Sequence, residues 1–464
     1  MASLQFLGAT GTVTGSKYVF SHKNSNIMVD CGLFQGLKEL RLRNWAPLKI
    51  DVNDLDAIVL THAHIDHTGY LPRLIKQGYN KPVYCTEPTR DLLEIMLLDS
   101  AHLQEEDAKY ANKKGISKHS PAMPLYSIED ARKAIGLLKG IPYEVPFHPS
   151  HEVIIRFQDA GHILGSAFVN VHWQEEDGEE KKILFSGDLG RFKRPILKDP
   201  TIVSDADYLL VESTYGNRLH EQGDPKNELK RIINDTISRK GVVVIPSFAV
   251  GRTQELLYTL RELENTGDIP VLPVYVDSPM AIKATKLYSK HTEIYDKEAN
   301  ALKEQGVDVL LTQRTEFTES VDASKRINAS NQPCIIISAS GMMTGGRILH
   351  HLIRRLPSPK NSIIFVGYQA EGTRGRALQR GNDKIKIHGQ QVKSAAAIET
   401  ISDFSAHADY NEILNWLGNF EKAPKKTFIV HGEPESSLNL KKLIDEKFAW
   451  FTHIPVYEEV VELN

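Results

Sequence analysis

Four side chains that can bind a metal ion stand within six consecutive residues, directly after a short apolar segment. The segment Asp56-Ala-Ile-Val-Leu60 has the composition of a buried strand, and Thr61-His62-Ala63-His64-Ile65-Asp66-His67 follows it. This spacing is too tight for one ion. His62 and His64 alternate and can face one ion, whereas Asp66 and His67 turn toward a second, which suits two ions about 3.5 to 4 Å apart. The pattern predicts a two-metal site at a strand end.

Two ions need more ligands, and candidates stand at comparable turns elsewhere in the chain. These turns are Asp159-Ala-Gly-His162, Ser186-Gly-Asp188 and Val430-His431-Gly432, each with a glycine that lets the backbone approach a cation. Asp30 ends the apolar segment 27–29 in a similar way. Its other interpretation is an ordinary turn cap, and the sequence alone leaves both open.

Composition excludes several classes of protein. The chain has 464 residues, 25% charged and 41% apolar, which is ordinary for a folded globular protein. No apolar run approaches 18 residues and no secretory signal opens the chain, so we expect a cytoplasmic protein without membrane segments. Three cysteines without a Cys-x-x-Cys pair argue against a disulfide framework and a thiolate zinc site. The net charge of −3 argues against binding polyanions over the whole surface.

One stretch of the chain is locally basic. Between Ser340 and Lys393 there are ten Lys or Arg residues and two acidic ones, Glu371 and Asp383. Charge alone favours solvated helix faces and an anion-binding surface about equally.

The strand and helix patterns divide the chain into two domains. The first half of the sequence predicts short strands and two helices, over 90–113 and 127–139. The dipeptide Asp177-Gly178 between two strand patterns predicts the tip of a hairpin. From Asp207 a rhythm of apolar strand, glycine turn and helix predicts a parallel sheet covered by helices. Short strands return near Ala395. We therefore expect an α/β protein in which a second domain begins at 208 and ends at 395.

The residues quoted so far, taken in order, resemble the metallo-β-lactamase superfamily. Three further segments, Glu212-Ser-Thr-Tyr-Gly, Phe404-Ser-Ala-His407-Ala-Asp and His431-Gly-Glu, are similar to motifs A, B and C of the β-CASP nucleases, the group containing the mRNA 3′-end processing endonuclease. The similarity extends through Pro246-Ser-Phe-Ala-Val-Gly-Arg, Ser338-Ala-Ser-Gly-Met and Gly367-Tyr-Gln-Ala-Glu-Gly-Thr. The resemblance implies a metallo-β-lactamase αββα sandwich over 1–207 and 396–464, interrupted by a Rossmann-like β-CASP domain over 208–395.

The resemblance also implies a role for each site residue. Two Zn²⁺ ions per chain are expected, one on His62, His64 and His162 and the other on Asp66, His67 and His431, with Asp188 between them. Asp30 would orient the ligand loop rather than bind metal. His407 would act as general acid and Glu212 would pair with it and raise its pKa. The expected catalytic residues are His407, Glu212, Asp188 and Asp66.

A third set of residues is expected to contact RNA phosphates. It lies at strand-to-helix turns and in the basic stretch, and its members are Ser247, Arg252, Ser340, Gly341, Thr373, Arg374 and Arg376. Ser247 and Ser340 could equally be helix caps. The Gly-Lys-Ser/Thr ending of a Walker loop is absent from the sequence, so no nucleotide cofactor is expected.

The expected function is zinc-dependent hydrolysis of RNA phosphodiester bonds, with endonucleolytic cleavage favoured. Two-metal hydroxide attack with His407 protonating the leaving oxygen would give 5′-phosphate and 3′-hydroxyl ends. His431 stands where the DNA-processing branch typically has valine, which favours single-stranded RNA as partner. A homodimer is possible within this family. The alternatives are a small-molecule ester, thioester or lactam hydrolase and a catalytically silent RNA-binding subunit.

Overall fold

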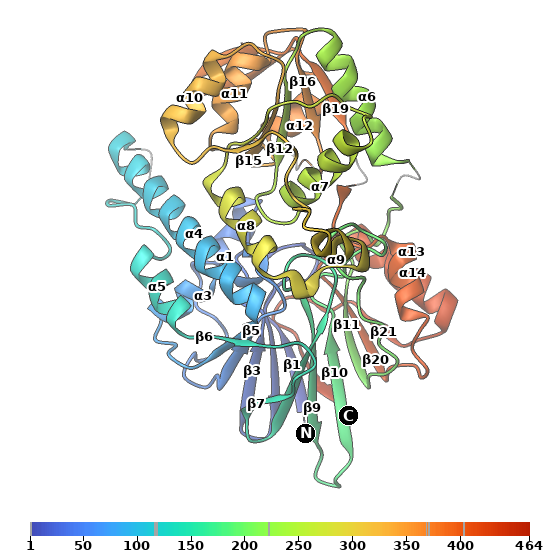
Figure 1. Cartoon of the computed structure of the whole chain (residues 1–464). Helices are drawn as coiled ribbons and strands as arrows, with labels where there is room; N and C mark the ends of the chain where they lie inside the picture. The colour runs from blue at the N-terminus through green and yellow to red at the C-terminus, as the bar shows by residue number, and fades with distance from the viewer. Residues whose placement is uncertain (1, 116–118, 221–222, 368, 370–371, 402–403) are drawn as a thin grey trace. The chain divides into compact units, whose positions relative to one another are not determined.

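The computed structural model describes residues 2–115, 119–220, 223–367, 369, 372–401 and 404–464. The chain forms two compact units, drawn together in Figure 1. Unit 1 holds residues 1–193, 199–219 and 407–464, and unit 2 holds residues 194–198 and 220–406. The second unit is therefore inserted into the first. This organisation confirms the predicted α/β class and the predicted insertion of one domain into another.

Unit 1 contains two seven-stranded sheets that share one apolar core. The first sheet has the order β22 (Val460–Leu463), β1 (Ala2–Phe6), β2 (Tyr18–His22), β3 (Ser25–Val29), β4 (Ala57–Val59), β5 (Val83–Thr86) and β6 (Leu138–Ile141). The second has the order β21 (Thr452–His453), β20 (Lys426–Val430), β11 (Tyr208–Glu212), β10 (Glu180–Phe185), β9 (Ala167–Gln174), β8 (Val153–Asp159) and β7 (Phe147–Ser150).

Alternation of side chains along these strands builds the core between the sheets. Val153, Ile155 and Phe157 of β8 share one face because successive side chains of a strand point to opposite sides, and they pack in one cluster with Phe6 and Phe20 from the first sheet. The helices of unit 1 lie outside this pair of layers: α1 (Lys38–Arg43), α2 (Ile65–Thr68), α3 (Leu71–Lys76), α4 (Glu87–Lys114), α5 (Ile128–Gly136), α13 (Tyr410–Leu417) and α14 (Pro434–Phe448).

The longest helix, α4, confirms the helix predicted over 90–113 and shows why it starts and stops where it does. The hydroxyl of Thr86 accepts a hydrogen bond from the backbone N–H of Thr89 at 3.3 Å, and Pro88 occupies the first turn. Gly115 ends the helix with φ +61°, a left-handed conformation that glycine adopts without strain.

Parallel pairing brings the important strand ends together within unit 1. β3, β4 and β5 are parallel neighbours, as are β10, β11 and β20. The carboxyl ends of parallel strands lie at one edge of a sheet. Asp30 and the 61–67 segment therefore lie at the carboxyl ends of strands in the first sheet. Asp188, Glu212 and His431 lie at the carboxyl ends of strands in the second sheet.

Unit 2 is built on a six-stranded, all-parallel sheet with an apolar core on each face. Its order is β14 (Thr315–Phe317), β13 (Val274–Val276), β15 (Ile335–Ala339), β12 (Val243–Ser247), β16 (Ser362–Phe365) and β19 (Ala397–Thr400). A two-stranded hairpin, β17 (Lys384–Ile387) and β18 (Gln390–Lys393), packs into one of these cores. The helical segments are α6 (Pro225–Ser238), α7 (Arg252–Asn265), α8 (Pro279–Lys290), η1 (Thr292–Ile294), α9 (Lys297–Glu304), α10 (Val321–Ala329), α11 (Ile348–Arg355) and α12 (Arg374–Gln379).

Two strands belong to a different unit from the domain in which the sequence predicts them. The run 208–211 was expected to open the inserted domain, but as β11 it pairs with β10 and β20 in unit 1. The run 397–400 was expected to mark the return to the first domain, but as β19 it pairs with β16 in unit 2. The helix expected over 127–139 ends at Gly136, and Leu138 begins β6.

Other expectations agree with the structure. Residues 174 and 180 are paired across the hairpin that has Asp177-Gly178 at its tip. All three cysteines are buried and free. None of the helices in the described ranges is long and apolar enough to cross a membrane.

Candidate metal centre

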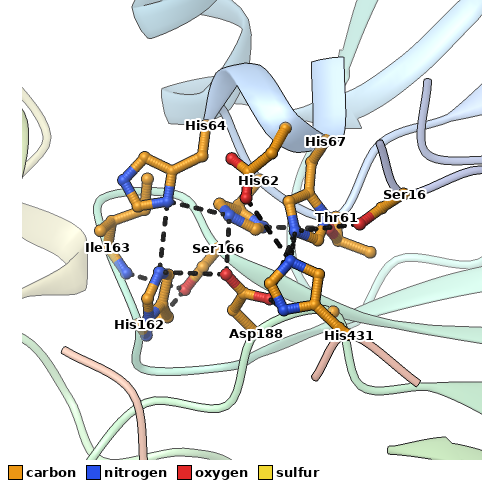
Figure 2. A network of polar contacts seen from close by, with 12 residues as sticks. Ser16, Thr61, His62, His64, His67, His162, Ile163, Ser166, Asp188 and His431 are labelled. Atoms are coloured by element: carbon orange, nitrogen blue, oxygen red, sulfur yellow. Dashed lines mark hydrogen bonds and ion pairs between the residues drawn. The ribbon is translucent and has the colours of Figure 1, made fainter. Parts of the chain in front are cut away.

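The candidate ligands come from four separate turns, all within unit 1. The 61–67 segment leaves β4, and His64 is the residue immediately before α2. His162 follows β8, Asp188 follows β10 and His431 follows β20. Figure 2 shows the side chains of the five histidines and Asp188 pointing toward one another, and a carboxylate oxygen of Asp66 lies within 4.8 Å of ring nitrogens of His67 and His431. All seven predicted ligands thus meet in one place.

Three histidines and one carboxylate form the first group. The Nε2 atoms of His62 and His162 lie 3.1 and 3.3 Å from Nδ1 of His64. Asp188 Oδ2 lies 3.4 Å from the first of these Nε2 atoms and 3.6 Å from the second. The four ligand atoms of this group are within 4.8 Å of one another. Nitrogen and carboxylate oxygen at this spacing are the donors that zinc prefers.

The second group consists of Asp66, His67 and His431. The two imidazoles approach each other through their Nε2 atoms, which are 3.2 Å apart, and Asp66 Oδ2 lies 3.5 Å from Nε2 of His431. Burial opposes ionisation of Asp66, but the hydrogen bond from His431 and the charge of His67 lower its pKa to about 2. Asp66 is therefore a carboxylate at neutral pH, which is the form that binds metal.

Asp188 lies between the two groups and presents one oxygen to each. Its Oδ2 faces His62 and His162, as given above, whereas Oδ1 lies 3.3 Å from Nε2 of His67 and 3.4 Å from Nδ1 of His431. Burial opposes the charge of Asp188, but the surrounding imidazoles hold its pKa well below the ordinary value. Oδ1 is buried and has no hydrogen-bond partner among the described residues. A buried carboxylate oxygen left in this way fits a bridging metal ligand.

Asp30 contacts the ligand segment rather than the candidate metal positions. It accepts hydrogen bonds from the Thr61 backbone N–H at 2.8 Å and from the Thr61 hydroxyl, and its Oδ2 lies 2.7 Å from Nδ1 of His67. The last contact directs Nε2 of His67 toward His431. These contacts favour the orienting interpretation of Asp30 over a simple turn cap.

Two threonines fix the orientation of two histidines. Because the Thr61 hydroxyl donates its hydrogen to Asp30, it can act only as an acceptor toward Nδ1 of His62, 3.0 Å away, which leaves Nε2 of His62 for a metal. The Thr214 hydroxyl donates to the carbonyl of His431 and accepts from its Nδ1 at 3.1 Å. Sequence patterns gave no sign of these roles, because a threonine beside a strand end usually reflects strand preference alone.

His407 and Glu212 form a pair beside the first group. Nδ1 of His407 lies 3.1 and 3.2 Å from the two carboxylate oxygens of Glu212, and its ring centre is 4.6 Å from that of His162. Glu212 is fully buried and also accepts from the backbone N–H groups of Leu189 and Thr214. Burial opposes the charged imidazole, but Glu212 and Asp188 raise the pKa of His407 to about 10.

A buried lysine, which the sequence did not single out, supports the turn that carries the ligands. The ammonium of Lys17 donates to the carbonyls of Gly15 and Gly32 at 3.1 and 2.5 Å, and it lies over the rings of Phe34 and Tyr70. The neighbouring residue Ser16 donates its backbone N–H to the carbonyl of Asp66, at 2.9 Å. Lys17 therefore links the loops that contain Gly15 and Gly32, and the first of these loops is hydrogen-bonded to α2.

Replacing Lys17 by alanine is expected to lower the free energy of unfolding by about 2–4 kcal/mol, because two buried carbonyls lose their donor and the side-chain volume is left empty. Urea unfolding of the metal-free protein measures this. Lys23→Ala, which removes an exposed lysine, is the matched control and should change stability by less than about 0.5 kcal/mol. Equal stabilities of the two variants would show that Lys17 has no supporting role.

The residues expected to contact RNA phosphates lie in unit 2, and the structure gives several of them internal partners. Arg252 is buried and donates to the carbonyl of Val366 at 2.8 Å. Arg374 donates to the carbonyls of Met343, Thr344 and Lys386.

The remaining members of this set lie at a strand end, in turns and at the start of α12 in unit 2. Ser247 is buried at the end of β12, and the Ser340 hydroxyl accepts from the backbone N–H of Thr344 at 3.0 Å. Gly341 accepts at its carbonyl from the side chain of Gln369, and Thr373 caps α12 by accepting from the N–H of Arg376. The acidic residue Glu371 lies outside the described residues.

Three family models match successive parts of the chain. Residues 10–229 match the metallo-beta-lactamase superfamily, residues 253–378 match the Beta-Casp domain, and residues 391–455 match the Zn-dependent metallo-hydrolase RNA specificity domain. A solved protein of unknown function from Enterococcus faecalis V583 shares the fold over the whole of both chains, with a TM-score of 0.56 at 13% identity. The fold and the histidine–aspartate site define a zinc-dependent metallo-hydrolase of the metallo-β-lactamase superfamily.

Relatives that match nearly the whole of this chain identify its family within this class. Ribonuclease TTHA0252 of Thermus thermophilus is 36% identical, and the match covers 94% of each chain. The RNase J-like protein of Methanocaldococcus jannaschii is 31% identical over 98% of each chain. Transcription termination factor FttA of the same organism is 32% identical over 99% of this chain and 72% of its own length. The chain belongs to the β-CASP ribonuclease family.

Proposed function

We propose that this protein hydrolyses phosphodiester bonds of single-stranded RNA with two zinc ions and favours internal cleavage. The observation that carries the proposal is Asp188, whose two oxygens face the two histidine-containing groups, with His407 beside the first group. RNA as substrate is supported by the names of two relatives, a ribonuclease and an RNase J-like protein, and by the RNA specificity domain model.

The ligand roles follow from the donor atoms. His62, His64 and His162 would hold one zinc ion, Asp66, His67 and His431 the other, and Asp188 both. When bound, zinc supplies Lewis-acid chemistry that activates water near neutral pH and offsets the negative charge of the phosphodiester. Asp30, Thr61 and Thr214 would hold the imidazoles in position from behind.

His407 would protonate the departing ribose oxygen. Because its Nδ1 faces Glu212, Nε2 is the atom that would give up the proton. Cations bound to Asp188 would cancel that residue's effect on the pKa of His407, but the effect of Glu212 would remain. In-line attack of water with departure of the 3′ oxygen would leave a 5′-phosphate on one fragment and a 3′-hydroxyl on the other.

The test is cleavage of single-stranded RNA labelled at either end, by zinc-loaded and by chelated protein. We expect zinc-dependent internal fragments from both labels, with a new 3′-hydroxyl on the 5′-labelled fragments and a new 5′-phosphate on the 3′-labelled fragments. Release of mononucleotides alone would overturn the internal mode. If RNA of varied sequence stayed intact while small esters, thioesters or lactams were hydrolysed, the small-molecule hydrolase would replace this proposal. Tight RNA binding with fewer than one zinc per chain would favour a silent RNA-binding subunit.

Glu212→Gln should move the alkaline limb of the pH–rate profile to lower pH by about one unit or more. A general acid must be protonated, so activity falls as the pH rises through its pKa. Loss of the Glu212 charge lowers the pKa of His407 and brings this fall to lower pH. Initial rates between pH 6 and 10 measure the shift, with zinc content as a control. An unchanged alkaline limb would exclude the proposed pairing.

A further inference from the structure

The basic stretch between residues 340 and 393 separates into two kinds of side chain in the structure. Some arginines form ion pairs or hydrogen bonds within unit 2. Arg347 pairs with Asp277 at 2.7 Å, and Arg355 is buried and donates to the carbonyls of Ile327 and Ser330. Arg374 is also bound to carbonyls, as described above. Three exposed lysines of the same stretch, Lys384, Lys386 and Lys393, lie together on the hairpin β17–β18.

The hairpin has one apolar face and one basic face. Ile385, Ile387 and Val392 are buried in a core cluster of unit 2, so the hairpin is fixed to the unit. The lysines occupy the alternate positions and therefore point the other way. Lys384 and Lys386 are about 7 Å apart along their strand by the usual rise per residue. Because the apolar face is packed in the core of unit 2, the basic face is held in a fixed position on this unit.

Two lysines on the basic face are placed so that their charges destabilise the hairpin. Lys384 is paired directly with Lys393 across the hairpin, and like charges in this position repel each other. Among the described residues, none of the three lysines has an ion pair. A bound anion would relieve this repulsion.

Two imidazoles stand at the end of this face. His388 lies in the hairpin turn with φ +47°, and its ring centre is 5.1 Å from that of His350 on α11, with 32° between the ring planes. Both residues are exposed. Partial desolvation and the neighbouring ring of His388 lower the pKa of His350, which favours the uncharged form of this ring. Imidazole rings are among the surfaces on which unpaired RNA bases stack.

We propose that the basic face of β17–β18, with His350 and His388 at its end, is a docking surface for single-stranded RNA. This inference rests on the proposed function and specifies where unit 2 holds the substrate. The lysines would bind successive phosphates, and the imidazoles would stack against a base. A positive row beside exposed flat rings suits a single strand, whose bases are free, better than an acidic protein.

The test is RNA binding by the whole zinc-loaded protein in which His407→Ala slows cleavage. A labelled 20-nucleotide uridine-rich RNA is titrated at several salt concentrations. Replacing Lys384, Lys386 and Lys393 by glutamine should weaken binding on the order of 10- to 100-fold at 0.1 M salt. It should also reduce the slope of log K against log salt by about 2, since each phosphate contact contributes roughly 0.7 for a single strand.

A matched variant separates position from net charge. Lys240, Lys283 and Lys297 are exposed lysines of unit 2, and replacing them by glutamine removes the same charge. This control should keep the parent affinity within about twofold and keep its salt slope. His350→Ala with His388→Ala should weaken binding without changing the slope, because stacking releases no counterions.

Two outcomes would overturn the inference, and they differ from failure of the proposed function. If the parent binds RNA and the hairpin variant matches the control in affinity and slope, the docking surface is elsewhere. If the parent binds no RNA, the proposed function fails as well. Thermal unfolding of each variant shows that a loss of binding is not a loss of folding, and Lys386→Glu alone gives the same test with one exposed substitution.

Discussion

His407→Ala is expected to slow RNA cleavage by roughly 10²- to 10⁴-fold, the contribution that a positioned general acid typically makes. Zinc content and RNA affinity should stay unchanged, since Nδ1 of His407 is directed to Glu212 and the residue is not among the proposed ligands. Single-turnover cleavage and metal analysis measure both. His148→Ala, an exposed histidine of the same unit, is the control and should keep the parent rate.

The choice of leaving group separates proton donation from a general loss of structure. A p-nitrophenyl phosphodiester releases an oxygen that needs no proton. The defect of His407→Ala should therefore be much smaller on this substrate than on RNA. Equal defects on the two substrates would remove His407 from the role of proton donor. Loss of zinc in the variant would mean that it supports the metal site instead.

Asp188→Asn should have the second large effect, on zinc binding as well as on cleavage. The amide cannot supply an anionic oxygen to both groups, and the six remaining carboxylate or imidazole ligands lose the carboxylate that lies between them. Removing even a residue that only supports a ligand typically weakens metal binding by about 10- to 100-fold. We therefore expect zinc affinity to fall by at least about 100-fold and RNA cleavage to reach background.

Competition with a chromophoric chelator measures the zinc affinity of this variant, and labelled RNA measures the rate. Asp107→Asn, on the exposed side of α4, is a matched control for the loss of one carboxylate. If Asp188→Asn bound two zinc ions as tightly as this control, Asp188 would not bridge the metals.

The side chains of the candidate metal centre could be predicted because each lies at a turn with its own local signal. The 61–67 cluster stands after an apolar strand, and His162, Asp188 and His431 stand beside glycines. The choice between a cap and an orienting role for Asp30 required the structure, since only its contacts to Thr61 and His67 separate the two. The same is true of Thr214 and Lys17, whose roles depend on partners far away in the chain.

The strands assigned to the wrong unit show the limit of an apolar pattern. β11 and most strands of the unit 2 sheet are buried on both faces, so their sequences read alike as continuous apolar runs. Only hydrogen bonding to β10 and β20 places β11. Charge counts have a similar limit, because the sequence cannot distinguish Arg355, which is buried, from Lys386, which is exposed.

The most direct test of the central claim is anomalous diffraction at the zinc edge from crystals of the zinc-loaded protein. Two anomalous peaks are predicted for each chain. One should lie among His62, His64 and His162, and the other among Asp66, His67 and His431, both within coordination distance of Asp188. A fully loaded protein with a single peak, or with zinc bound away from Asp188, would contradict the account.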